Sequence, residues 1–175
     1  MAKRLLLPIV AFGIFFCLSS CTDGEQPGTT FPDYAAFAIN RSAWTEPGDY
    51  SFTYEVRWGD GYVYAPVSVT VSGGTAEIDY GENDDPGEFT DNPLLGDISF
   101  ESIAGIYEYF ENWWEKTAAE ENTGYVITFS VQYNTTSGGT VYPVYLEEDM
   151  HPLSVGADGG YGGLYIHISN LIIPE

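Results

Sequence analysis

Two histidines are the scarcest residues of this chain that could serve acid–base catalysis. His151 lies in an acidic stretch. His167 alternates with the apolar Ile166 and Ile168, which predicts that it lies on the polar side of a strand. Because an exposed histidine needs no functional explanation, an ordinary surface position is the simpler interpretation of both.

One group of residues around His151 offers nitrogen and oxygen ligands for a weak divalent metal site. Its members are Glu148, Asp149, His151 and Asp158. Their spacing fits no standard ligand motif, so a charged loop is the favoured interpretation.

A second group of hard oxygen ligands lies in the turn-rich stretch 81–97, where no hydrophobic period survives. The candidate calcium ligands are Glu82, Asp84, Asp85, Glu88 and Asp91, with Asn83 among them. A flexible loop of carboxylates suits calcium, but the run lacks the ligand order of an EF-hand. Calcium is therefore a possible cofactor, and a solvated acidic loop is the alternative.

Other catalytic motifs are missing from the sequence. It contains no nucleophile elbow, no phosphate-binding glycine loop, no HExxH and no paired-cysteine motif. We therefore predict that the protein is not an enzyme. A hydrolase built on a buried histidine–carboxylate pair is the less favoured alternative.

Four aromatic residues are the candidate binding residues: Trp58, Tyr62, Tyr64 and Tyr145. Alternation turns the three tyrosines away from the predicted core, and Trp58 ends its strand beside a turn. Exposed aromatic rings among acids suit a basic protein surface or a sugar. Cross-strand packing is the alternative, because aromatic pairs also stabilise sheets without a ligand.

The N-terminus has the pattern of a secretory signal. Lys3 and Arg4 precede an apolar run over 5–18, and Ser19 and Ser20 lead to Cys21. The sequence 18–21 resembles the lipobox of bacterial lipoproteins, in which the cysteine becomes the acylated first residue. This predicts a signal peptide over 1–20, a palmitate-type lipid on Cys21 and anchoring in the cell envelope, at the outer membrane or cell surface.

Residues 21–31 are polar, which predicts a flexible tether and leaves 32–175 as one domain. After removal of the signal, three basic residues face 26 acidic ones, a net charge of −23. Such a field repels nucleic acid and favours a partner with a basic surface.

The most strongly patterned element is an amphipathic helix over 99–116. Ser99 is its expected N-cap, with Glu101 in the first turn and Lys116 in the last. Its apolar stripe contains Ile103, Ile106, Tyr107, Phe110, Trp113 and Trp114. A stripe of this width needs a sheet to cover it.

Strand patterns lie on both sides of this helix, and a shorter helix over 32–44 precedes them. The expected strands are 50–58, 62–72, 75–80, 124–133, 140–147 and 163–172. Pro66 indicates an edge position or a bulge, and Pro143 indicates an edge position. The order of helix, three strands, helix and three strands predicts an α+β fold with a single antiparallel sheet of about six strands and helices packed on one face.

Several segments share a recognisable pattern: residues 40–44, 49–54, 67–74, 98–103, 131–133 and 141–145, with Asp149 and Asp158 beyond them. Together they resemble domain-of-unknown-function family 6174, which consists of bacterial secreted proteins and lipoproteins. The chain departs from the family pattern at 58–61, where many members have cysteines, and at Val141, where they have glycine. The resemblance implies a fold and a compartment, but no activity.

These features favour a lipid-anchored envelope protein that acts as a non-enzymatic binding module. Its partners would be the membrane, through Cys21, and a protein or glycan. An acidic inhibitor of a cationic secreted enzyme, such as a lysozyme or protease, and a calcium-binding envelope domain are the alternatives.

Overall fold

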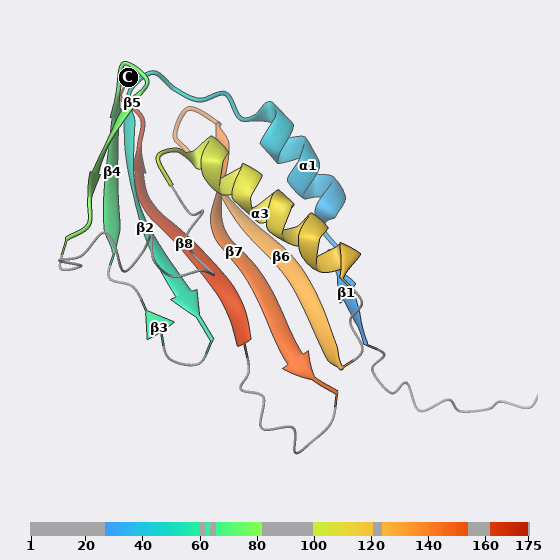
Figure 1. Cartoon of the computed structure of the whole chain (residues 1–175). Helices are drawn as coiled ribbons and strands as arrows, with labels where there is room; N and C mark the ends of the chain where they lie inside the picture. The colour runs from blue at the N-terminus through green and yellow to red at the C-terminus, as the bar shows by residue number, and fades with distance from the viewer. Residues whose placement is uncertain are drawn as a thin grey trace, which may run out of the picture.

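A computed structural model describes residues 27–59, 62–63, 66–81, 100–120, 124–153 and 162–174. Its framework is an eight-stranded sheet in the order β1-β6-β7-β8-β2-β4-β5, with the short β3 paired to β2 (Figure 1). The strands are β1 Gly28–Thr30, β2 Tyr50–Trp58, β3 Tyr62–Val63, β4 Val67–Ser72, β5 Thr75–Asp79, β6 Tyr125–Thr135, β7 Val141–Pro152 and β8 Gly162–Ile172.

The sheet is mixed, whereas the sequence predicted about six antiparallel strands. β1 pairs with β6 in parallel, and all other neighbours are antiparallel. β1 falls in the stretch that was predicted as a tether. The sequence did not predict this strand, because its three residues show no alternation of apolar and polar side chains. Residues 62–72 form two strands instead of one, and Pro66 lies outside both.

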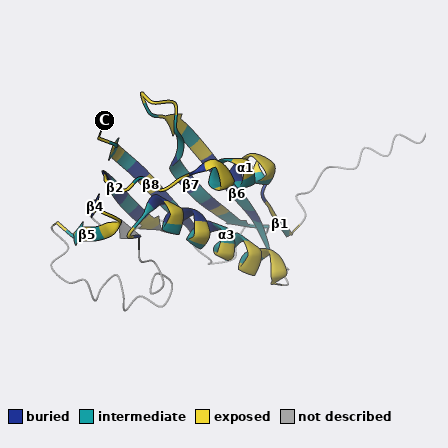
Figure 2. Cartoon of the chain, turned by 90° about the horizontal axis from the view of Figure 1, so that it is seen from above, coloured by how far each residue is buried: buried dark blue, intermediate teal, exposed yellow. Residues whose placement is uncertain are grey.

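Helices α1 (Tyr34–Ala43) and α3 (Ile103–Ala119) lie on one side of the sheet (Figure 1), which confirms the α+β fold. The predicted stripe of α3 faces the sheet: Ile103, Ile106, Tyr107 and Phe110 are buried, and the two tryptophans pack at its margin. Figure 2 shows exposed residues on both helices. Within the described part of the chain, neither helix has the length and apolarity needed to span a membrane.

Alternation along the strands supplies the other half of the core. In β2, Tyr50, Phe52, Tyr54 and Val56 are buried, while the residues between them are more exposed. The same pattern in β4, β6 and β8 gives one continuous apolar face, whose side chains contribute about 1.5–3 kcal/mol each when fully buried.

The helix ends differ from the sequence prediction. The N-cap of α3 is Ser102, whose hydroxyl accepts a hydrogen bond from the Gly105 amide at 2.9 Å, and Ser99 lies outside the described residues. Glu101 therefore precedes the helix. Helix α1 starts at Tyr34, two residues after Pro32, and Asp33 occupies its N-cap without a side-chain bond. Lys116 lies in the last turn of α3 as predicted.

β7 is longer and more central than predicted. It extends to Pro152 instead of ending at Glu147, and it lies between β6 and β8. Pro143 is buried inside the sheet, next to an irregularity in the β6–β7 pairing, and not at an edge. A bulge relieves the missing amide there, so proline does not require an edge strand.

Glu148 is the one buried charged residue among those described, with 4% of its surface exposed. It lies on the inner face of the sheet between Phe129 and Leu164 in neighbouring strands. Burial raises the pKa of its carboxyl, and hydrogen bonds with the Trp113 side chain and the Leu164 backbone oppose that rise.

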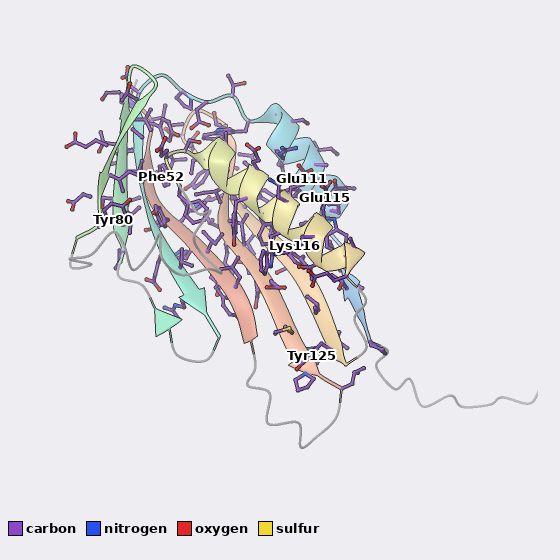
Figure 3. The ribbon with its side chains drawn as sticks, in the orientation of Figure 1. Phe52, Tyr80, Glu111, Glu115, Lys116 and Tyr125 are labelled. Atoms are coloured by element: carbon purple, nitrogen blue, oxygen red, sulfur yellow. The ribbon has the colours of Figure 1, made fainter. Side chains whose placement is uncertain are left out.

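Polar contacts fix α3 against its surroundings. Glu111 lies on the side of α3 that faces α1 (Figure 3). It accepts a hydrogen bond from the Tyr34 hydroxyl and pairs with Arg41 at 2.5 Å. At the N-terminal end of α3, the Glu46 carboxylate, in the linker before β2, accepts a hydrogen bond from the Ala104 amide at 3.1 Å. It also accepts one from the Tyr50 hydroxyl. This carboxylate caps the positive end of the helix from outside it.

Replacing Glu46 with alanine should lower the free energy of unfolding by about 1 kcal/mol, the usual cost of losing a helix cap. The measurement is urea denaturation followed by circular dichroism. Glu101→Ala is the matched control, since Glu101 is an exposed carboxylate that precedes the N-cap of α3. Equal losses in both variants would contradict the capping role.

Glu148→Gln should make stability less dependent on pH. Because the folded state favours the protonated carboxyl, its contribution is complete below the ordinary glutamate pKa and is lost as pH rises through the raised folded value. We expect similar free energies of unfolding at pH 4, and a variant more stable than the wild type at pH 8 by on the order of 1 kcal/mol.

Urea titrations at both pH values test this expectation. Glu147→Gln is the control, because the neighbouring side chain points to the opposite face of the sheet. A Glu148→Gln variant that is no more stable than the wild type at pH 8 would show that burial of the carboxylate carries no penalty.

Candidate functional site

The candidate site lies on the outer face of the central strands, which neither α1 nor α3 covers. Strand register brings two rows of side chains together there. One row runs Glu55, His167, Tyr145 and Gln132, and the next runs Arg57, Tyr165, Glu147 and Ser130, across β2, β8, β7 and β6. Because outer and inner positions alternate, this grid is the reverse side of the apolar core.

An ion pair forms the β2 side of the site. The Nε of Arg57 donates to Oε1 of Glu55 at 2.7 Å, and this contact raises the pKa of the guanidinium. The Glu55 side chain is 22% exposed and that of Arg57 56% exposed. The pair therefore presents a donor and an acceptor on the surface with little net charge.

Three rings form the rest of the site. The Tyr145 ring centroid lies 6.1 Å from that of Tyr165 and 6.1 Å from that of His167, with the ring planes inclined by 54° and 56°. Because the three rings are inclined to one another, they form the sides of a hollow and not a flat surface. Together with Glu55 and Arg57 they line a hollow of about 150 Å³.

The Tyr145 hydroxyl stays protonated well beyond neutral pH. Burial raises its pKa most, and the carboxylate of Glu147 adds to this effect, while Arg57 lowers it. The phenol is thus a neutral donor and acceptor for a ligand.

Gly163 determines where the Tyr165 ring lies. A Cβ at Gly163 would approach the Glu148 carbonyl oxygen to 2.3 Å and Cε2 of Tyr165 to 3.3 Å. Tyr165 is two residues after Gly163 and lies on the same face of the strand. Its ring therefore covers the space that a side chain at position 163 would fill. Only glycine permits both this ring position and the close approach of β7 and β8.

Two larger hollows lie elsewhere among the described residues. One of about 300 Å³ is lined by Arg41 and Trp44, which already bind Glu111 and Glu46. The other, of about 510 Å³, lies between the β6–β7 hairpin and residues 171–174, and its lining contains no ionisable side chain except the Tyr142 phenol. The outer-face hollow is the one of these three whose lining side chains all come from paired central strands of the sheet.

The structure places some predicted site residues and not others. Tyr145 lies on the polar face as predicted, and His167 is exposed beside it. Trp58 and Tyr62 pair through their backbones in β2 and β3, but their side chains lie outside the described residues, as does Tyr64. Cys21 and the predicted calcium ligands Glu82, Asp84, Asp85, Glu88 and Asp91 also lie outside, so calcium binding stays a prediction.

The described members of the candidate divalent group around His151 do not cluster, and residues 148–151 belong to β7 instead of the charged loop that the sequence favoured. Glu148 and Asp149 are successive residues of β7 and point to opposite faces of the sheet, because a strand alternates. His151 faces Asp149, with Nδ1 3.8 Å from Oδ2, and Asp158 lies outside the described residues. In the part of the chain that the structure describes, no three potential ligands gather around one point.

Sequence reasoning missed three members of the hollow: Glu55, Arg57 and Tyr165. Their outward orientation was readable from alternation in 50–58 and 163–172. Their proximity was not, because it depends on the pairing of β8 with β2, between segments more than one hundred residues apart.

Gly163→Ala should lower the free energy of unfolding by roughly 1–3 kcal/mol, because the new methyl group cannot fit against the β7 backbone. Gly138→Ala is the control. A methyl group there would lie 3.8 Å from its nearest neighbour, the Thr136 hydroxyl oxygen, which is an ordinary van der Waals distance. Urea denaturation measures both variants. A Gly163→Ala protein as stable as the control variant would mean that the two strands can separate freely at this point.

No protein-family model, curated protein or solved structure matches the chain. The resemblance to family 6174 therefore stays a prediction, and candidate functions rest on the geometry and chemistry of the site.

Proposed function

We propose that this chain is a non-enzymatic binding module of the bacterial cell envelope, held at the membrane by a lipid on Cys21. The outer face of the sheet contacts the partner. The observation that carries this proposal is the hollow formed by Tyr145, Tyr165, His167, Glu55 and Arg57 on the side opposite the helices.

Three strands hold these side chains, and each strand is paired on both sides. A paired central strand fixes the position of its side chains better than a loop does, which lowers the entropy cost of binding. The aromatic rings provide apolar contact area, and the ion pair provides orientation.

A binding role fits the chemistry of the hollow better than catalysis does. His167 is exposed, and its ring lies beside Tyr145 and not in a water-excluding cleft. Acid–base catalysis depends on positioned groups whose pKa values are tuned by burial or by neighbouring charges.

The outer face is testable by photocrosslinking in cells that produce the full chain. A benzoylphenylalanine at Gln132, exposed beside the hollow, should yield a crosslinked adduct, and one at Ile39, exposed on α1, should not. Cys21→Ser should release the protein from the membrane fraction. Adducts from Ile39 alone, or from neither position, would contradict a partner on the outer face.

The charge of the chain favours a second candidate, an acidic inhibitor of a cationic secreted enzyme. Its support is the net charge of −21, which attracts basic proteins over distances of about 10 Å at moderate salt. Inhibition of a lysozyme or a trypsin-like protease that weakens steeply with added salt is the expected result. A lack of inhibition across such a panel would remove this candidate.

A further inference from the structure

The size of the outer-face hollow limits what it can hold. At about 150 Å³ it is smaller than the roughly 300–1,000 Å³ of typical small-molecule sites, so it accepts one ring or one side chain of a larger ligand. The rest of that ligand must lie across the open face. A polymer with repeating units meets this requirement.

The charges of the hollow select against an ionic unit. Arg57 and Glu55 are held together at 2.7 Å at its edge. An incoming cation would meet the Arg57 guanidinium, and an incoming anion would meet the Glu55 carboxylate. An uncharged polar unit can accept a hydrogen bond from Arg57 and donate one to Glu55, and neither residue repels it.

The rings select for a unit with an apolar face. Tyr145 and Tyr165 are partly exposed and inclined to one another, so each can offer a ring face or edge to C–H groups. The Tyr145 hydroxyl adds a neutral donor and acceptor at the margin. A sugar ring combines C–H faces with equatorial hydroxyl groups and matches both sets.

We infer that the outer-face hollow binds one sugar residue of an uncharged glycan. This inference rests on the proposed function, because it names the class of ligand for the same face. In the bound state Tyr145 and Tyr165 contact the faces of the sugar ring, and the Arg57–Glu55 pair orients its hydroxyl groups. The neighbouring sugar residues of the glycan lie along the outer faces of β6 and β7.

Binding of an uncharged sugar in this hollow differs from attraction to the acidic surface of the whole chain in its dependence on salt. A basic peptide would be attracted to the net negative charge at any point on the surface, and its binding would fall steeply with salt. Contacts between aromatic rings and an uncharged sugar do not involve counterions, so their strength changes little with salt.

The test uses the full lipidated protein in detergent micelles and isothermal titration calorimetry. The probes are uncharged tetrasaccharides, tetra-N-acetylchitotetraose, cellotetraose and maltotetraose, with hexaarginine and tetragalacturonate as charged comparators. We expect saturable binding of at least one uncharged tetrasaccharide, with an affinity that changes less than about twofold between about 0.05 and 0.5 M NaCl. Saturable binding by hexaarginine alone would overturn the inference.

Variants locate the site. Tyr165→Ala and Arg57→Gln should each weaken binding at least about fivefold, whereas Tyr34→Ala, a partly buried tyrosine on the helix side, should leave it within about twofold. Thermal unfolding by circular dichroism identifies any variant that fails to fold. Arg57 is more than half exposed, so its substitution keeps the test valid if Tyr165→Ala unfolds.

The outcomes distinguish this inference from the proposed function. If none of the uncharged tetrasaccharides binds while Gln132 still crosslinks a partner, the glycan inference fails and the binding module stands. If sugar binding survives both Tyr165→Ala and Arg57→Gln, the hollow is not the site and the inference fails. If Gln132 gives no adduct and no probe binds, both fail.

Discussion

The pairing of β8 with β2 is the constraint on which the rest of this structure depends. β8 is the last strand in the chain, yet it lies in the middle of the sheet, with β7 on one side and β2 on the other. It joins the meander β2-β4-β5 to the ribbon β6-β7. Without it, two small sheets would each expose an unpaired edge, and neither would be wide enough to cover α3.

The same strand explains why the two faces of the sheet differ so strongly. Leu164, Ile166 and Ile168 are almost completely buried under the helices, while Tyr165 and His167 between them face outward. A shift of one residue in its register would exchange the two sets and expose the core. The burial of the apolar set therefore also fixes the position of the outer aromatic residues.

Polar groups carry positional information in this acidic chain. Glu46 binds the first turn of α3, Glu111 connects α3 to α1, and Glu148 lies inside the core next to Trp113. Hydrogen bonds and ion pairs hold each of these carboxyl groups in one geometry. Apolar contacts alone would allow the packed elements to shift relative to one another. Net charge is thus an incomplete description of what the carboxylates do here.

The local pattern of the chain determined much of the fold. Alternation gave β2 its bounds and placed Tyr145, Tyr165 and His167 on the polar face, and the 3.6-residue period identified the buried stripe of α3. Both depend on neighbours within a few residues, which is why they are readable in one dimension. The cap at Ser102 was missed although its partner Gly105 is only three residues away, because Ser99 is an equally suitable type of capping residue. The short β1 and the full length of β7 were missed because strand pairing lies outside the local window.

What the sequence determined by itself is therefore which side chains are buried and which face solvent in each element. Only the tertiary structure decided which of those elements are neighbours. Bringing Glu55 and Arg57 beside Tyr145 and Tyr165 requires pairing between segments far apart in the chain. The physical reason is that backbone hydrogen bonds between strands are the same for every sequence, so the choice of partner follows from packing the whole core at once.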